Sequence, residues 1–203
     1  MLIIVRHGQT EANARGVLLG RSDPPLDGTG RDQASAVAAE LAPLKKTTRV
    51  ISSPLRRTRE TAAIIAREGL VDIDERWIEL NYGVFEGKPV LDISMDTWTQ
   101  WRTDPDFAPE GGETLRALGQ RVSKACAELL AAGIDDDVIV VTHVSPVKAA
   151  VVWALDVGNE VTWRMYVAPG SITRIADRRH GPVLVAFNET PWSSSGGIGE
   201  SDG

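Results

Sequence analysis

The fold of this chain is decided by residues 2–13, which read Leu-Ile-Ile-Val-Arg-His-Gly-Gln-Thr-Glu-Ala-Asn. The run Leu2–Val5 is wholly apolar and is followed at once by the charge of Arg6. A short apolar run of this kind is typical of a strand that is buried on both faces, as in a parallel sheet. Open α/β sheets place their ligand sites at the carboxyl ends of such strands. The stretch therefore predicts a buried strand with Arg6 and His7 at a ligand-binding edge.

Apolar runs and helical patterns alternate along the rest of the chain. We expect further strands at 49–51, 71–73, 138–142, 163–167, 171–176 and 183–187, and helices at 29–41, 54–67, 97–102, 114–132 and 145–155. Alternation of strands and helices predicts an α/β fold. The expected architecture is a three-layer α/β/α sandwich with a mostly parallel central sheet.

The length of 203 residues fits one compact domain, which we place at 1–190. Residues 80–112 are irregular apart from one short helix, and we interpret them as an insertion on the substrate side. The tail 191–203 is rich in Ser and Gly and is expected to be disordered. The lone Cys126 excludes an internal disulfide and a cysteine-based zinc cluster, and its place in an amphipathic helix predicts that it is simply buried.

The charge of the chain limits its partners. The formal net charge is −6, which makes general nucleic-acid binding a poor hypothesis. Residues 1–60 nevertheless carry +4, whereas residues 61–203 carry −10. The N-terminal apolar run is too short for a signal peptide, and no apolar stretch is long enough to span a bilayer. We therefore expect a cytoplasmic protein with neither membrane nor nucleic-acid partners.

Four further segments place chemically useful residues beside the ends of predicted elements. These segments are 52–62 (SSPLRRTRETA), 79–87 (ELNYGVFEG), 110–114 (EGGET) and the pair Thr142-His143. Together with residues 6–13, and in this order, they resemble the histidine phosphatase superfamily, the phosphoglycerate-mutase-like fold, over about 2–188. The phrase 144–148 (VSPVK) is similar to the acid phosphatase halves of actinobacterial ribonuclease H fusions and to the α-ribazole-phosphatase-like branch.

The resemblance implies a role for five residues. His7 would be the nucleophile that carries the phosphoryl group, and Glu79 would protonate the leaving alcohol and later deprotonate water. Arg6, Arg57 and His143 would bind and stabilise that group, His143 acting as a donor if it is protonated. Independent chemistry agrees, because a neutral imidazole can attack phosphorus and a planar guanidinium grips phosphoryl oxygens as a fork. The amides at the start of the helix after His143 would favour an anion as well.

Other residues in these segments have more than one interpretation. Asn13 matches a phosphate contact of the family, although an asparagine here could equally cap a loop. Glu86 is interpreted as a structural carboxylate, and Arg56 and Arg59 as solvated helix surface. Leu19 stands where many phosphatases of the family carry a glutamine that helps to hold the phosphate. Either another donor substitutes for that glutamine or the site is less polar on that side.

A second Arg-His-Gly, at residues 179–181, lies between two strand-like runs and is followed by Pro182. We interpret it as a hairpin turn, so that His180 is not the nucleophile.

Two other patterns suggest sites but favour structural interpretations. Trp98 and Trp101 lie on one helical face, and core packing is favoured over the wall of an acceptor pocket. The acidic run 135–137 is interpreted as a solvated loop, and neither a metal nor a cofactor is expected.

The leading functional hypothesis is a metal-independent phosphomonoester hydrolase that acts through phospho-His7 on small phosphorylated metabolites. A cofactor-dependent phosphoglycerate mutase is the alternative, although the short interval from Arg57 to His143 favours water as the acceptor. A non-catalytic phosphate-binding module is a third hypothesis, and the proton donor Glu79 argues against it because a binder needs none. The expected partner is a small phosphorylated substrate, and a homodimer is compatible with the resemblance.

Overall fold

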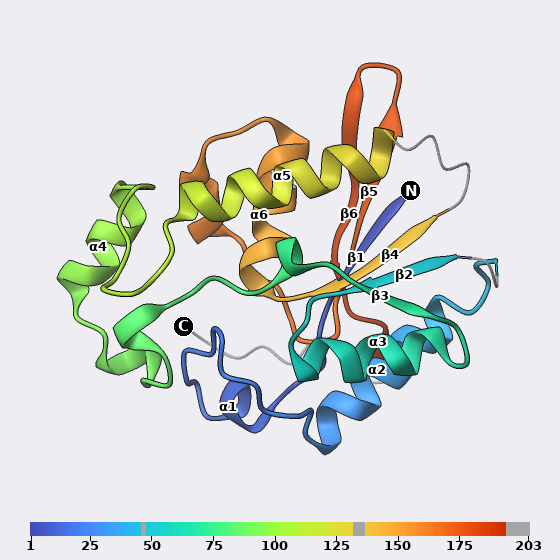
Figure 1. Ribbon diagram of the computed structural model, residues 1–203, viewed down its shortest axis with the longest axis horizontal. Coiled ribbons are helices and arrows are strands. Elements are labelled where there is room, and N and C mark those ends of the chain that lie inside the picture. The colour runs from blue at the N-terminus through green and yellow to red at the C-terminus, as the bar shows by residue number, and fades with distance from the viewer. Residues whose placement is uncertain (46–47, 132–136, 194–203) are drawn as a thin grey trace.

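The computed structural model describes residues 1–45, 48–131 and 137–193 and contains a six-stranded sheet in the order β3-β2-β4-β1-β5-β6 (Figure 1). The strands are β1 (Leu2–Arg6), β2 (Arg49–Ser52), β3 (Val71–Ile73), β4 (Val138–Thr142), β5 (Ile172–Arg178) and β6 (Gly181–Glu189). The four strands β3, β2, β4 and β1 are parallel, and β5 and β6 extend the sheet antiparallel. The predicted mostly parallel sheet is confirmed.

Two helices cover each face of the sheet (Figure 1). One pair is α5 (Leu115–Ala131) and α6 (Val144–Leu155), and the other is α2 (Gly28–Glu40) and α3 (Arg56–Ala66). Successive side chains of a strand point to opposite faces. Leu2 and Ile4 accordingly join the core under α5 and α6, whereas Ile3 and Val5 join the core under α2 and α3. The wholly apolar β1 is thus explained by burial on both faces, and the three-layer prediction is confirmed.

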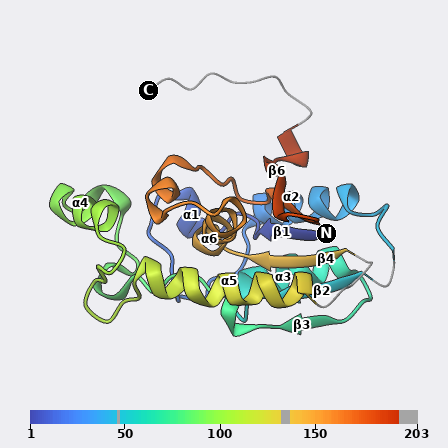
Figure 2. The same ribbon diagram turned by 90° about the horizontal axis from the view of Figure 1, so that it is seen from above.

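The 80–112 segment contains two short 3₁₀ helices, η2 (Gly83–Phe85) and η3 (Val90–Asp92), and one α-helix, α4 (Met95–Thr103). Figures 1 and 2 both show α4 at one end of the molecule, away from the sheet. Trp101 is 1% exposed and its ring lies 5.5 Å from that of Trp98, which in turn meets Trp163 at 5.9 Å. The expectation that the tryptophan pair packs is confirmed.

The strand predicted at 163–167 is wrong. The chain instead forms the 3₁₀ helix η4 (Asn159–Arg164) and continues irregularly to Gly170. The alternating apolar pattern has another cause. Trp163 packs edge-to-face on Trp98, and Val167 is buried separately in the core. Two unrelated contacts therefore bury these side chains without a neighbouring strand.

Several boundaries and local features also differ from the predictions. A short helix, α1 (Glu11–Ala14), forms in the predicted loop, because Thr10 and Asn13 make a reciprocal capping box. The N-cap of α6 is His143, not Ser145. Residues 191–193 of the predicted tail form a 3₁₀ turn, η5 (Pro191–Ser193), with the remainder outside the described residues.

The interpretations of Cys126 and of the second Arg-His-Gly are confirmed. Cys126 is fully buried in α5, and Arg178 pairs with Gly181 across the β5–β6 turn. Asp135 and Asp136 lie outside the described residues, and Asp137 forms an ion pair with the amino group of Met1. No helix in the part of the chain that the structure describes is long and apolar enough to cross a membrane.

Candidate active site

The first histidine is buried at the carboxyl end of β1, where it is 3% exposed. Its Nδ1 lies 2.6 Å from the carbonyl oxygen of Gly8, so we assign the ring proton to Nδ1 as donor. The lone pair then resides on Nε2, which accepts a hydrogen bond from Nε of Arg57 at 3.2 Å. His7 is therefore a neutral imidazole with its basic nitrogen turned toward a guanidinium, as expected of a ring held by its other nitrogen.

Close backbone packing fixes the loop that follows His7. Gly8 lies against Gly30 in the first turn of α2, and a Cβ on either residue would overlap backbone of the other segment. Gln9 donates its backbone N–H to the side chain of Gln33 at 2.9 Å. The glycine at position 8 is therefore required by the near contact of two backbones.

Arg57 enters the site from the first turn of α3 and is fully buried. Its two terminal nitrogens donate to the carbonyl oxygens of Gly20 and Ser22, at 2.7 and 2.6 Å. This arrangement differs from the expected free fork, because two carbonyls already occupy one side of the guanidinium. The carbonyls fix the plane of Arg57 and direct its Nε toward His7.

Glu86 secures the loop that holds Arg57. Its carboxylate accepts hydrogen bonds from the backbone N–H groups of Gly20, Arg21 and Ser22, at 3.0 to 3.1 Å. The same peptide segment therefore donates to Glu86 and accepts from Arg57. The interpretation of Glu86 as a structural carboxylate is confirmed, and the contact that makes it structural is one that the sequence did not indicate.

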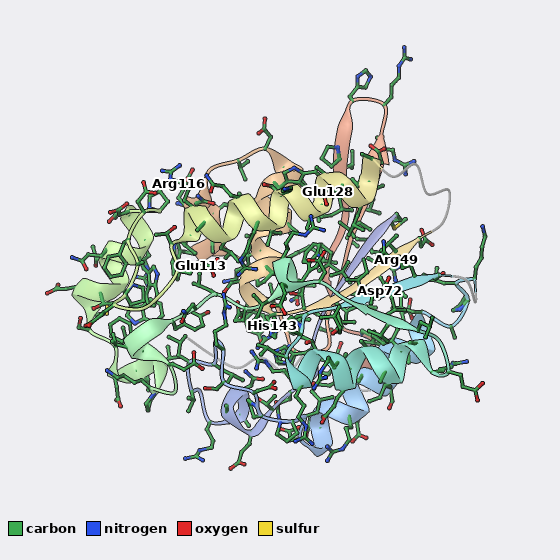
Figure 3. The ribbon with its side chains drawn as sticks, in the orientation of Figure 1. Arg49, Asp72, Glu113, Arg116, Glu128 and His143 are labelled. Atoms are coloured by element: carbon green, nitrogen blue, oxygen red, sulfur yellow. The ribbon has the colours of Figure 1, made fainter. Side chains whose placement is uncertain are left out.

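The second histidine follows β4 and begins α6, near the middle of the molecule (Figure 3). The ring of His143 meets that of His7 edge-on, with centroids 5.1 Å apart. Its Nε2 lies 2.7 Å from the hydroxyl oxygen of Ser53. We assign the Ser53 hydroxyl as the donor to Nε2, which places the ring proton of His143 on Nδ1. Ser53 is thus a positioning residue that sequence reasoning missed, although it belongs to the segment 52–62.

Two buried donors of this cluster have no hydrogen-bond partner among the described residues: Nε of Arg6 and Nδ1 of His143. Arg6 is otherwise held by the carbonyl oxygen of Val167, which accepts from one terminal nitrogen at 2.5 Å. Buried donors in folded proteins are nearly always paired, and an orphan requires an explanation. Two orphans beside two guanidinium groups fit a bound anion.

Glu79 is 2% exposed and lies between η1 (Glu75–Trp77) and η2. Its Oε1 accepts hydrogen bonds from the backbone N–H groups of Leu80, at 2.7 Å, and Ser145, at 3.3 Å. The contact with Ser145 changes one expectation, because this amide at the start of α6 serves Glu79 and is not left for an anion. Burial raises the pKa of Glu79 above the ordinary value, although these amides and the nearby arginines act in the opposite direction.

The backbone of Glu79 is held from outside the site. Arg21 and Arg121 both donate to its carbonyl oxygen, at 2.8 and 3.3 Å. Both arginines also form ion pairs with Glu113, at the start of α5 (Figure 3). This network gives the segment 110–114 its structural role.

The two imidazoles are neutral. Burial, followed by the charges of Arg57 and Arg6, lowers the pKa of His7 well below the ordinary value. The same causes, with His7 itself, lower the pKa of His143. The lowered pKa of His143 disfavours the protonated form in the protein by itself, so this ring contributes one N–H donor. Burial also lowers the pKa of Arg57, to about 10, which leaves the guanidinium charged near neutral pH.

The structure brings five of the six predicted site residues together: His7, Arg57, His143, Arg6 and Glu79. The Oδ1 of Asn13 accepts hydrogen bonds from the backbone N–H and the hydroxyl of Thr10, at 3.1 and 2.9 Å. The capping interpretation of Asn13 is confirmed, and its role as a phosphate contact stays a prediction. Leu19 is partly buried immediately before Gly20, so the position of the family glutamine adjoins a carbonyl that holds Arg57.

A mostly parallel sheet gathers two buried histidines, a buried and a partly buried arginine and a buried glutamate at its carboxyl edge. This is the arrangement of a phosphate-handling α/β protein. A sequence model of the histidine phosphatase superfamily (branch 1) matches residues 2–190. The chain belongs to this superfamily.

Curated relatives are similar along much or all of the chain. The bifunctional protein Rv2228c of Mycobacterium tuberculosis is 31% identical over 177 residues, which is 85% of this chain and 49% of the relative. The chain thus spans about half the length of that protein. The probable phosphoglycerate mutase GpmB of Yersinia enterocolitica is 32% identical over 209 residues, with 100% of this chain and 92% of the relative covered.

Among solved structures, the mycobacterial glucosyl-3-phosphoglycerate phosphatase Rv2419c in complex with VO3 superimposes with a TM-score of 0.83. It is 28% identical, and the match covers 93% of this chain and 98% of that chain. The superfamily and this neighbour support phosphatase activity.

Proposed function

We propose that this protein is a metal-independent phosphomonoester hydrolase that acts on small phosphorylated metabolites through a phosphohistidine at His7. The observation that carries the proposal is the state of His7. Its ring is neutral, its Nδ1 donates to the Gly8 carbonyl oxygen, and its Nε2 accepts from Arg57. A nucleophile must present a lone pair to phosphorus, and this ring presents Nε2 beside a cation that would bind the phosphoryl oxygens.

In the first step, Nε2 of His7 attacks phosphorus and the bond between phosphorus and the ester oxygen breaks. Glu79, which its burial keeps protonated to a higher pH than usual, gives its proton to the leaving alkoxide. Arg6, Arg57 and the N–H of His143 stabilise the charge on the equatorial oxygens. The arginines supply the positive charge that a metal ion supplies in many phosphoryl-transfer enzymes.

In the second step, water attacks phosphorus on the side that the alcohol has left. The carboxylate of Glu79 takes the proton of that water, and the bond between phosphorus and Nε2 breaks. Inorganic phosphate leaves, and both His7 and Glu79 regain their starting protonation. A single carboxylic acid thus serves as acid and then as base, which requires a pKa nearer the working pH than that of an exposed glutamate.

Brief exposure to a radiolabelled phosphomonoester, quenched in alkali to preserve phosphohistidine, tests the proposal. We expect label on the wild-type chain and none on the His7→Ala variant. Label that persists in His7→Ala would place the nucleophile elsewhere. A tight vanadate complex without turnover on any phosphoester would instead support the non-catalytic phosphate-binding module.

A phosphoglycerate mutase is the second candidate, because GpmB is named a probable phosphoglycerate mutase and the match covers 92% of its length. The two activities share the first step and differ in the acceptor. Incubation with 3-phosphoglycerate separates them: free phosphate supports the hydrolase, and 2-phosphoglycerate supports the mutase.

A further inference from the structure

Lys148 is a cation that the proposed chemistry does not use. It lies on α6 three residues after Ser145, whose backbone N–H donates to Glu79. Residues three apart share one face of a helix, and helical side chains lean toward the N-terminus. The long side chain of Lys148 therefore extends from the second turn of α6 back toward Glu79.

The ammonium of Lys148 has no hydrogen-bond acceptor or ion-pair partner within 1–45, 48–131 and 137–193, although the residue is partly buried. The charged groups that act on it are Glu79, which attracts it, and Arg6, which repels it. Burial is the largest influence and lowers the pKa of Lys148. Lys148 is therefore a cation without a partner among the described residues, close enough to Glu79 for the two charges to interact.

The charges of the site leave Lys148 available for a ligand. A phosphoryl dianion matches the two guanidinium groups of Arg6 and Arg57. Glu79 must hold a proton in the first step, so it offers Lys148 no full negative charge at that stage. Because Glu79 protonates the leaving oxygen, the cation beside it lies on the leaving-group side of phosphorus.

We propose that Lys148 binds a carboxylate on the alcohol part of the substrate, close to the ester oxygen, and so selects phosphorylated acids over neutral phosphoesters. The inference rests on the proposed function, because it is Glu79 as proton donor that defines the leaving-group side. A single ammonium matches the single charge of a carboxylate. Lys148 is accordingly a specificity residue that leaves the phosphoryl contacts to the arginines.

Binding to a variant that cannot turn over tests this role without relying on catalysis. In a His7→Ala background, the Kd of 3-phosphoglycerate is compared with that of glycerol 3-phosphate, which has a hydroxymethyl group where the first has a carboxylate. Adding Lys148→Met should raise the Kd of 3-phosphoglycerate by about ten- to a hundredfold, which is the contribution of a hydrogen bond to a charged group. The Kd of glycerol 3-phosphate should change by less than about threefold. Lys148→Arg should retain part of the preference.

The control is Lys124→Met, which removes the same charge from the exposed face of α5 and should alter neither Kd. If Lys148→Met does not fold, Lys148→Gln makes the same comparison.

Equal weakening of the binding of both ligands, or no weakening, would overturn the role of Lys148. Failure of both ligands to bind the His7→Ala variant would overturn it as well. Phosphate release by the wild-type chain is measured separately. A Lys148-dependent binding preference in a chain that releases no phosphate would refute the hydrolase and leave the role of Lys148 standing.

Discussion

The tripeptide Arg-His-Gly occurs twice in this chain, and the two copies have opposite surroundings. The first ends β1, a strand paired on both sides, and its His7 is 3% exposed. The second forms the turn between β5 and β6, where His180 is exposed to solvent. The first glycine is required by contact with Gly30, whereas Gly181 is required by its φ of 114°. The two glycines thus satisfy unrelated constraints.

The difference shows that the chemistry belongs to the surroundings of the tripeptide. Burial and two neighbouring guanidinium groups lower the pKa of His7, and a backbone carbonyl fixes its tautomer. A second histidine and a buried glutamate complete the first cluster. His180 is exposed, and its ring has no hydrogen-bond partner among the described residues.

The largest expected effect separates the two histidines directly. His7→Ala should reduce kcat toward a phosphomonoester by at least about ten-thousandfold, because it removes the nucleophile. His180→Ala removes the same side chain from the turn and should leave kcat unchanged. Steady-state kinetics of the two purified variants measure both values. Comparable losses of kcat in the two variants would contradict the assignment of the nucleophile to His7 alone.

A second prediction concerns the acid that only the first tripeptide has nearby. Glu79→Gln should lower kcat/KM for an alkyl phosphate by about a hundred- to a thousandfold, since the alkoxide then leaves without a proton. The loss in kcat/KM, which reports the first step alone, should be much smaller for 4-nitrophenyl phosphate, whose leaving group needs no proton. Equal losses for the two esters would contradict the role of Glu79 as general acid.

The pH dependence of the wild-type chain provides a matched test. With an alkyl phosphate, kcat/KM should fall as pH rises through the raised pKa of Glu79, because the deprotonated acid cannot donate in the first step. On the acid side, activity should persist below the ordinary titration range of imidazole, because the lowered pKa keeps His7 unprotonated there. The alkaline decline should be absent from Glu79→Gln. An activity that instead falls near the ordinary imidazole pKa as pH drops would contradict a neutral, buried His7.

Much of this site could be predicted because its residues stand at the ends of strongly patterned elements. The apolar runs of β1 and β4 located Arg6, His7 and His143 at one sheet edge, and the family resemblance added Arg57 and Glu79. The partners of these residues could not be predicted in the same way. The carbonyls of Gly20 and Ser22, and the amides that bind Glu86, are backbone groups common to every sequence.

The fold was predictable wherever the spacing of apolar residues reflected a single helix or strand. It was not predictable at 163–167, where an alternating pattern arose from two unrelated packing contacts. The same limit applies to α1, which is too short to show a period and depends on a capping box. The protonation state of His143 was left open for another reason, because the number of cations around a buried ring is a property of the assembled site.

The two glycines of the tripeptides predict different losses of stability. Gly8→Ala should lower the free energy of unfolding by about 3 kcal/mol, because the new Cβ overlaps the backbone of Gly30 and α2 must shift. Gly181→Ala should cost only about 1 kcal/mol, since its Cβ meets nothing within 4 Å and only the positive φ is strained. Thermal unfolding should show a Tm lower by about 6–12 °C for the first and about 2–4 °C for the second. Equal shifts would mean that the packing of Gly8 on Gly30 is not a constraint.

The smallest expected effect tests the partner of His143, a feature that the second tripeptide lacks. Ser53→Ala removes the hydroxyl that lies 2.7 Å from Nε2 of His143, so the ring loses the contact that orients it and assigns its proton to Nδ1. Because the ring stays packed against His7, we expect kcat to fall by only about tenfold, with a parallel weakening of vanadate binding. Ser35→Ala, on the exposed face of α2, removes a hydroxyl of the same kind and should change neither quantity. If Ser53→Ala lowered Tm but left kcat and vanadate affinity intact, Ser53 would support the fold alone, and the orphaned Nδ1 of His143 would need another explanation than an anion.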